Sequence, residues 1–199
     1  MATPLILPLL PLDGEVLLPG QRLELSSEAT WRAGAWGNAP EGPVAVSLRD
    51  DDTVHEIGVI AGVDSSGEQY SLHGLRRCRL LALVQERLPP MVEVEPLAES
   101  PSEDPRGSRL AHLLHRRFEN LCQQIGRTQA PATALLTLSP LTWTVVASLG
   151  LSADQQQGFL NVSDPLARGR LLLLAIRELS QRERFLRPWG HLRSGSQWN

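Results

Sequence analysis

The chain has 199 residues, of which 42% are hydrophobic and 21% charged, and its formal net charge is -3. Its 19 basic residues are all arginine. This excludes a Walker A phosphate loop, a Schiff-base enzyme and a Ser–Lys hydrolase, because each of them needs a lysine. The near-neutral charge gives no electrostatic sign of nucleic-acid binding.

The two cysteines, Cys78 and Cys122, are too few for a disulfide scaffold or a cysteine-built metal site. We expect both to be reduced thiols in a cytoplasmic protein. The apolar N-terminus is interrupted by Pro4, Pro8 and Pro11 and has no preceding basic region. It is therefore expected to be neither a signal peptide nor a membrane span.

The first hundred residues contain short apolar runs separated by Gly, Pro and Asp, and each run predicts a β-strand. Pro19-Gly20 predicts a tight turn, and Asp64-Ser65-Ser66-Gly67 predicts a hairpin turn. Residues Ser27–Trp36 could instead form a short helix. Many short strands without a long helix between them predict a closed or half-closed antiparallel barrel. The predicted strands are Leu5–Leu9, Val16–Leu18, Val44–Leu48, Val54–Val63, Gln69–Leu75, Arg79–Val84 and Met91–Pro96.

The pattern changes near residue 100. Residues 98–106 are rich in Pro, Ser and acidic residues and predict a linker between a barrel over 1–100 and a helical bundle over 107–187. Apolar residues between Leu110 and Ile125 recur at helical spacing and form one stripe. The tail over 188–199 is expected to be loose.

Several helix boundaries can be predicted in the second half of the chain. Either Ser102 or Ser108 is available to start the first helix, and Gly126 is expected just after its end. The pairs Ser139-Pro140 and Asp164-Pro165 each predict an N-cap followed by a proline at the first helical position. Ser152 with Gln155 fits a capping box. Four or five helices follow from these signals.

Four motifs occur in order along the chain: LPLLPL at 7–12, VLLPG at 16–20, HEIGVIA at 55–61 and GLRRCRL at 74–80. Together they resemble the Lon protease N-terminal, substrate-binding domain family, over about residues 5–186. The resemblance implies an α+β fold, with a PUA-like antiparallel β-barrel followed by an α-helical bundle. The chain looks like a stand-alone bacterial-type member, without the ATPase and Ser–Lys protease modules of full-length Lon proteases.

Four residues are candidates for a binding site. Trp36 lies among glycines and could be an exposed anchor for a partner. Gly58 lies within a strand, where a glycine marks a bulge or a close backbone approach and could leave room for a peptide. Arg76 and Arg77 belong to a basic cluster with Arg79, which could clamp an anion or cover the barrel rim and pair with acidic residues.

No catalytic motif is recognisable, and no metal or cofactor site is predicted. His112, His115 and Glu119 lie on one helix face but have no fourth ligand nearby, so a solvated face is the simpler interpretation. We therefore expect a non-enzymatic module that binds unfolded or extended polypeptide, working as a substrate-binding or adaptor protein with a protease or chaperone partner. Two alternatives remain open: a PUA-like RNA-binding protein and a small-ligand binder or hydrolase. The sequence does not fix the oligomeric state.

Overall fold

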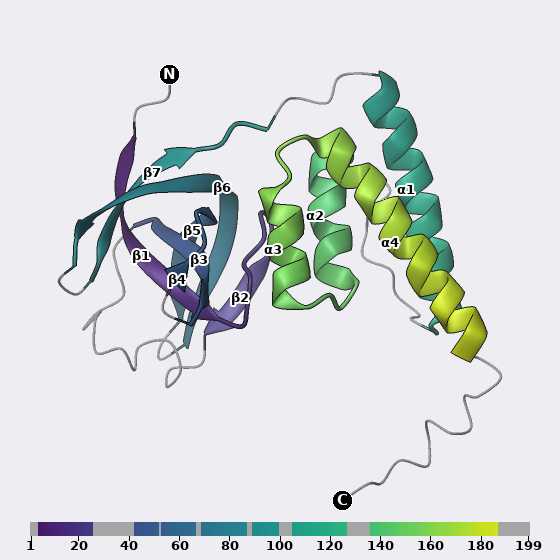
Figure 1. Ribbon diagram of the computed structural model, residues 1–199, viewed down its shortest axis with the longest axis horizontal. Helices are drawn as coiled ribbons and strands as arrows, with labels where there is room; N and C mark the ends of the chain where they lie inside the picture. Colours follow the sequence, from purple (N-terminus) through teal and green to yellow (C-terminus); the bar gives the residue numbers. More distant parts are fainter. Residues whose placement is uncertain are drawn as a thin grey trace, which may run out of the picture. The chain divides into compact units, whose positions relative to one another are not determined.

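The computed structural model contains seven strands and four helices in the residues that it describes (Figure 1). The described residues are 4–25, 42–51, 53–66, 69–86, 89–99, 105–126 and 136–186. The strands are β1 (Leu5–Asp13), β2 (Arg22–Leu25), β3 (Val44–Asp50), β4 (Thr53–Val54), β5 (Ile57–Ser66), β6 (Gln69–Gln85) and β7 (Met91–Pro96). The helices are α1 (Pro105–Gln124), α2 (Leu138–Ser148), α3 (Ala153–Asn161) and α4 (Pro165–Leu186). This is the α+β class that the sequence predicted.

The chain folds into two compact units that do not follow its sequence order. The first unit combines Met1–Ser100 with Val146–Ser163. The second combines Pro101–Val145 with Asp164–Asn199. The helical half therefore contributes α3 and the end of α2 to the barrel unit.

The first unit is built on one sheet that closes into a barrel, with strands in the order β1-β7-β6-β5-β3 and a pairing between β3 and β1. The expected antiparallel pairing holds around most of the circuit, whereas β1 and β3 run parallel. The short strand β2 pairs with β6, and the short strand β4 pairs with β3. Within this circuit, Leu5–Pro8 of β1 and Gly62–Ser66 of β5 each pair with one neighbouring strand only.

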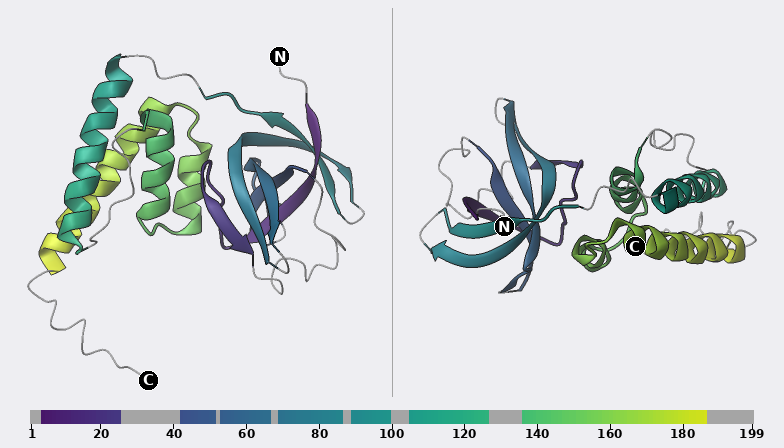
Figure 2. Two further views of the ribbon diagram at one scale, coloured as in Figure 1. Left: turned by 180° about the vertical axis from the view of Figure 1, so that it is seen from behind. Right: turned by 90° about the horizontal axis from the view of Figure 1, so that it is seen from above.

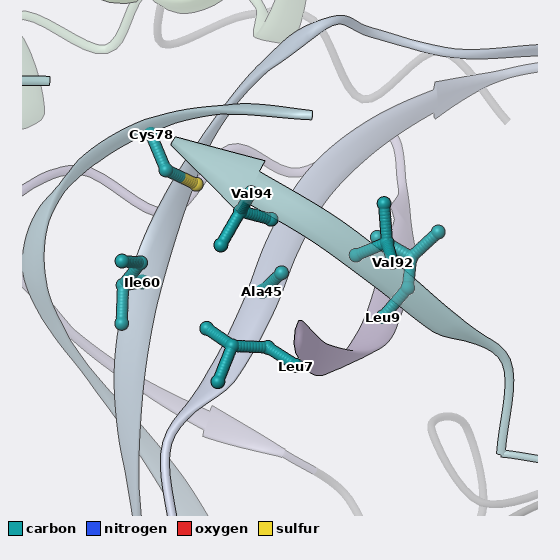
Figure 3. Close-up of a cluster of buried hydrophobic side chains, with 7 residues drawn as sticks. All are labelled: Leu7, Leu9, Ala45, Ile60, Cys78, Val92 and Val94. Carbon is teal, nitrogen blue, oxygen red and sulfur yellow. The ribbon is translucent and has the colours of Figure 1, made fainter. Parts of the chain in front are cut away.

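The barrel interior is filled by apolar side chains from five strands (Figure 3). Alternation along β7 turns Val92 and Val94 inward, while Glu93 and Glu95 are less buried. This is the alternation expected for a strand with one buried face. The cluster consists of Leu7, Leu9, Ala45, Ile60, Cys78, Val92 and Val94.

Four predicted strands differ from the observed ones. Val16–Leu18 is buried but forms no strand, because it leads into a turn at Gly20, whose φ is 77°. That turn is held by hydrogen bonds from the Gly20 amide to the Gly74 carbonyl (2.8 Å) and from the Gly74 amide to the Gln21 carbonyl (2.9 Å). The predicted strand Val54–Val63 is divided between β4 and β5. The predicted strands Gln69–Leu75 and Arg79–Val84 form one continuous strand, β6.

Helix α3 is attached to the barrel by a buried amide. The Gln157 Nε2 donates a hydrogen bond of 2.8 Å to the Ile57 carbonyl on β5. The predicted capping box is present, since the Ser152 side chain accepts from the Gln155 amide and the Gln155 side chain accepts from the Ser152 amide. Gly150, just before it, has a φ of 64°, as a glycine that ends the preceding helix should.

In the second unit, α1 and α4 lie side by side (Figures 1 and 2). Helix α1 begins at Pro105, between the two serines proposed as its start, and Gly126 after it has a φ of 72°. Helix α2 begins at Leu138, one residue before the predicted N-cap Ser139. The Asp164 carboxylate accepts from the backbone amides of Leu166 (3.0 Å) and Ala167 (3.2 Å), so the predicted N-cap of α4 is confirmed. None of the helices in the described ranges combines the length and apolar character needed to cross a bilayer.

Candidate functional site

The barrel carries a group of large apolar side chains that face solvent where β1, β7 and β6 run side by side. Ile6 of β1 and Leu81, Leu83 and Val84 of β6 are each between 49% and 58% exposed. Glu93 of β7 pairs with both Ile6 and Ala82, so these strands lie within about 10 Å of one another. We call Ile6, Leu81, Leu83 and Val84 the barrel apolar strip.

Two irregularities in β6 account for part of this strip. The pairing with β7 passes from Leu80 opposite Val94 to Ala82 opposite Glu93, which leaves Leu81 as an extra residue. It then passes from Leu83 opposite Val92 to Gln85 opposite Met91, which leaves Val84 as a second extra residue. Bulges of this kind redirect side chains and are common next to functional sites.

The barrel apolar strip was not predicted from the sequence, although a signal for it is present. Residues 80–84, LLALV, are five consecutive apolar residues in a barrel strand. A strand with one buried face can hide only every second side chain, so some of the five had to face solvent or a partner.

The three arginines of the predicted basic cluster are all on β6 but have different environments. Arg76 is exposed, whereas Arg77 is only 1% exposed, and its Nε and Nη1 have no hydrogen-bond partner. Loss of hydration on burial lowers the pKa of Arg77, and the nearby charge of Glu99 opposes that shift. Arg79 pairs with Glu56 (2.9 Å) and, at 4.0 Å, with Glu95. The cluster therefore does not present three free cations to one ligand.

Gly58 is a site of close backbone approach, as one of the two sequence interpretations proposed. A Cβ at this position would overlap the Val46 carbonyl oxygen on β3 and lie 3.1 Å from the Ser47 Cβ. The space beside Gly58 is thus occupied by the neighbouring strand. Trp36, the proposed anchor, lies outside the described residues, and its role stays a prediction.

The polar clusters noted in the sequence do not form a metal centre in the described part of the chain, where no group of three His, Cys, Asp or Glu side chains converges. The His115 Nε2 lies 3.3 Å from a Glu119 carboxylate oxygen, one turn away on α1. The His115 side chain is 20% exposed and the Glu119 side chain 45% exposed, so this helix face is partly covered.

A closed barrel that precedes a set of helices defines an α+β domain. The family model described as "ATP-dependent protease La (LON) substrate-binding domain" matches residues 6–178. The chain therefore belongs to the Lon substrate-binding domain family, which is the non-catalytic substrate-recognition domain of Lon.

Two solved structures share this fold. The N-terminal domain of Mycobacterium avium complex Lon protease superposes with a TM-score of 0.69 at 21% identity, covering 86% of this chain and 98% of that one. A Lon N-terminal domain protein from Xanthomonas campestris superposes with a TM-score of 0.58 at 24% identity, covering 85% and 98%. No match to a protein of curated function was found.

Proposed function

We propose that this protein binds exposed apolar segments of unfolded or extended polypeptides through the barrel apolar strip, without catalysing a reaction on them. The single observation that carries this proposal is the strip itself: Ile6 of β1 and Leu81, Leu83 and Val84 of β6, the strands on either side of β7, are each about half exposed. Groups of large apolar side chains exposed on one part of a protein surface are candidates for a binding site. Membership of a substrate-binding family supports a polypeptide as the ligand.

Side-chain burial is the binding mode that the barrel apolar strip supports. Addition of a strand needs a free sheet edge, and the described free edges are short: β2 has four residues, β4 has two, Leu5–Pro8 of β1 pairs with β7 alone, and Gly62–Ser66 of β5 pairs with β6 alone. A polypeptide that lays an apolar side chain on Leu81 or Val84 gains about 1.5–3 kcal/mol for each large side chain fully removed from water.

We infer further that the protein acts in the cytoplasm, as a substrate-binding or adaptor protein for a protease or chaperone. The Cys78 thiol is buried and forms no disulfide, which supports a reducing compartment. The RNA-binding alternative has less support, because Arg77 is buried and Arg79 is engaged by two acidic residues.

Fluorescence anisotropy with a labelled, reduced and carboxymethylated protein as the unfolded ligand tests the proposal. The double variant Leu81→Gln/Val84→Thr should weaken binding by about tenfold or more, given the free energy of burying two such side chains. Leu171→Gln on α4 is the matched control, because Leu171 is similarly exposed, at 45%, in the other unit. Unchanged affinity in the double variant would contradict the proposal, as would tighter, salt-dependent binding of a single-stranded RNA.

A further inference from the structure

A groove runs between α1 and α4 in the second unit, with a volume of about 770 Å³. Its α1 wall consists of five residues that lie along one face of the helix: Leu113, Arg117, Asn120, Gln123 and Gln124. The α4 wall extends from Leu173 to Arg184. Each wall covers eleven helical steps, so the groove is about 16 Å long, or three turns of helix.

All the charged residues that line this groove are positive. Arg117, Arg177 and Arg184 line it and are exposed, and no Asp or Glu is among the lining residues. Within the described part of the chain, none of the three takes part in an ion pair. The protein as a whole carries a net charge of -3, so this concentration of positive charge is local rather than a consequence of composition.

Four apolar residues also line the groove, and two of them are partly open to solvent. Leu113 is 44% exposed and Leu174 is 55% exposed, whereas Leu173 and Ile176 are more buried. Such a surface gains stability when it is covered by other apolar side chains. An occupant must therefore combine apolar residues on one face with acidic residues at the sides.

We propose that this groove binds an acidic amphipathic segment of another protein, about three helical turns long. The segment sets leucine-like side chains on Leu113 and Leu174, and its carboxylates pair with Arg117, Arg177 and Arg184. Arginine suits this role, because its planar guanidinium can donate two parallel hydrogen bonds to one carboxylate. Asn120, Gln123, Gln124 and Gln181 add amide groups along the walls.

Two other occupants fit the groove less well. A nucleic acid would use aromatic side chains for base stacking, and the lining residues contain no Phe, Tyr or Trp. The chain's own segments that follow α1 and α4, residues 127–135 and 187–199, contain Arg127, Arg187 and Arg193 but no acidic residue, so their charge matches that of the groove instead of complementing it.

The test uses the full chain and a fluorescein-labelled synthetic peptide of about 14 residues, with Leu at i, i+3/i+4 and i+7 spacing and Glu at the flanking positions. Fluorescence anisotropy should detect binding that weakens as NaCl rises from about 50 to about 300 mM. A peptide with Gln in place of every Glu, and one with Ser in place of every Leu, should each bind at least about tenfold more weakly.

Matched charge variants locate the site. The triple variant Arg117→Gln/Arg177→Gln/Arg184→Gln should weaken binding by about tenfold, as expected for three ion pairs at a partly exposed site. The control Arg116→Gln/Arg170→Gln/Arg182→Gln removes three exposed arginines from the same helices outside the groove lining and should leave affinity nearly unchanged. Because every substitution is at an exposed position, the far-UV circular dichroism and Tm of both variants should match those of the parent chain.

Three results would overturn the proposal. Equal weakening by the two triple variants would show that binding follows overall charge and not the groove. Undiminished binding of the Gln-substituted peptide would remove the role of the carboxylates. Tighter binding of a single-stranded RNA, with the same dependence on the three groove arginines, would identify a nucleic acid as the occupant. The double variant Leu81→Gln/Val84→Thr should not affect peptide binding, so the groove and the barrel apolar strip can fail separately.

Discussion

The guanidinium carbon of Arg168 lies 3.6 Å from the centroid of the Trp143 ring. This contact joins the first turn of α4 to the middle of α2 inside the second unit. Arg168 is fully buried, and its Nε donates to the Thr142 hydroxyl (2.9 Å) while its Nη2 donates to the Ser139 hydroxyl (3.0 Å). The ring face and the two hydroxyls thus replace part of the hydration that the cation loses on burial.

The aromatic face of Trp143 should therefore contribute to stability in addition to the volume that the side chain fills. We expect Trp143→Leu to lower the free energy of unfolding by about 3 kcal/mol, because it removes both the packing and the aromatic face. Trp143→Phe keeps a face and should cost about 1 kcal/mol less than the leucine variant. Urea unfolding followed by far-UV circular dichroism measures both changes. Equal losses in the two variants would show that the cation gains nothing from the ring.

The two glycines within β5 provide a matched pair. Gly58→Ala should destabilise the barrel by about 1–3 kcal/mol, because the new Cβ overlaps the backbone oxygen of Val46, which cannot move without shifting β3. Gly62→Ala meets nothing within 4 Å and should be neutral or stabilising by up to about 1 kcal/mol. Thermal unfolding of both variants checks this. A Gly58→Ala variant as stable as the parent would show that the close approach is not needed.

The N-cap of α4 can be tested by keeping or removing its acceptor atom. Asp164→Ala should lower the free energy of unfolding by about 1 kcal/mol, since it removes both acceptors for the Leu166 and Ala167 amides. Asp164→Asn keeps one oxygen at this position and should cost much less. Urea unfolding distinguishes the two. If the asparagine variant lost as much as the alanine variant, then charge at the helix end, not hydrogen bonding, would be the main contribution.

The buried Cys78 thiol should make stability depend on pH in the alkaline range. Burial raises its pKa from the ordinary value of 9.0 to about 12. Between these pH values the unfolded chain releases a proton that the folded chain retains, so the free energy of unfolding should fall as the pH rises from about 9 to about 12. Below pH 9 this contribution is fully present.

Urea unfolding of the parent chain and Cys78→Ala at several pH values in this range isolates the effect from other titrating groups. If the thiol is responsible, the free energy of unfolding of the variant should fall less steeply with pH than that of the parent chain. This comparison holds whatever the stability of the variant at neutral pH. Identical slopes would contradict the assignment.

Most secondary structure that depends on a few adjacent residues could be predicted from the sequence. The strand Met91–Pro96 and the caps at Ser152 and Asp164 were predicted because alternation and capping are properties of a few adjacent residues. The turn at Gly20 was predicted for the same reason, since only a few residues determine a positive φ.

Features that depend on distant partners were not predictable in this way. Val16–Leu18 is as apolar as a strand but is held in a buried turn by Gly74, more than fifty residues away. The assignment of α3 to the barrel unit depends on Gln157, whose partner is the Ile57 carbonyl. Periodicity indicates which face of an element is buried, but not which other element covers it. The burial of Arg77 and the groove between α1 and α4 therefore could not be predicted from the sequence.

The parallel pairing that closes the barrel has a consequence for the order in which the protein can form as it is synthesised. Strand β1 emerges first, but its two neighbours are β3 and β7, and α3 follows only after α1 and α2 have been made. The first unit therefore cannot be completed before much of the second has left the ribosome. Such long-range pairings slow folding, and the two units must acquire their structure as an interleaved pair instead of one after the other.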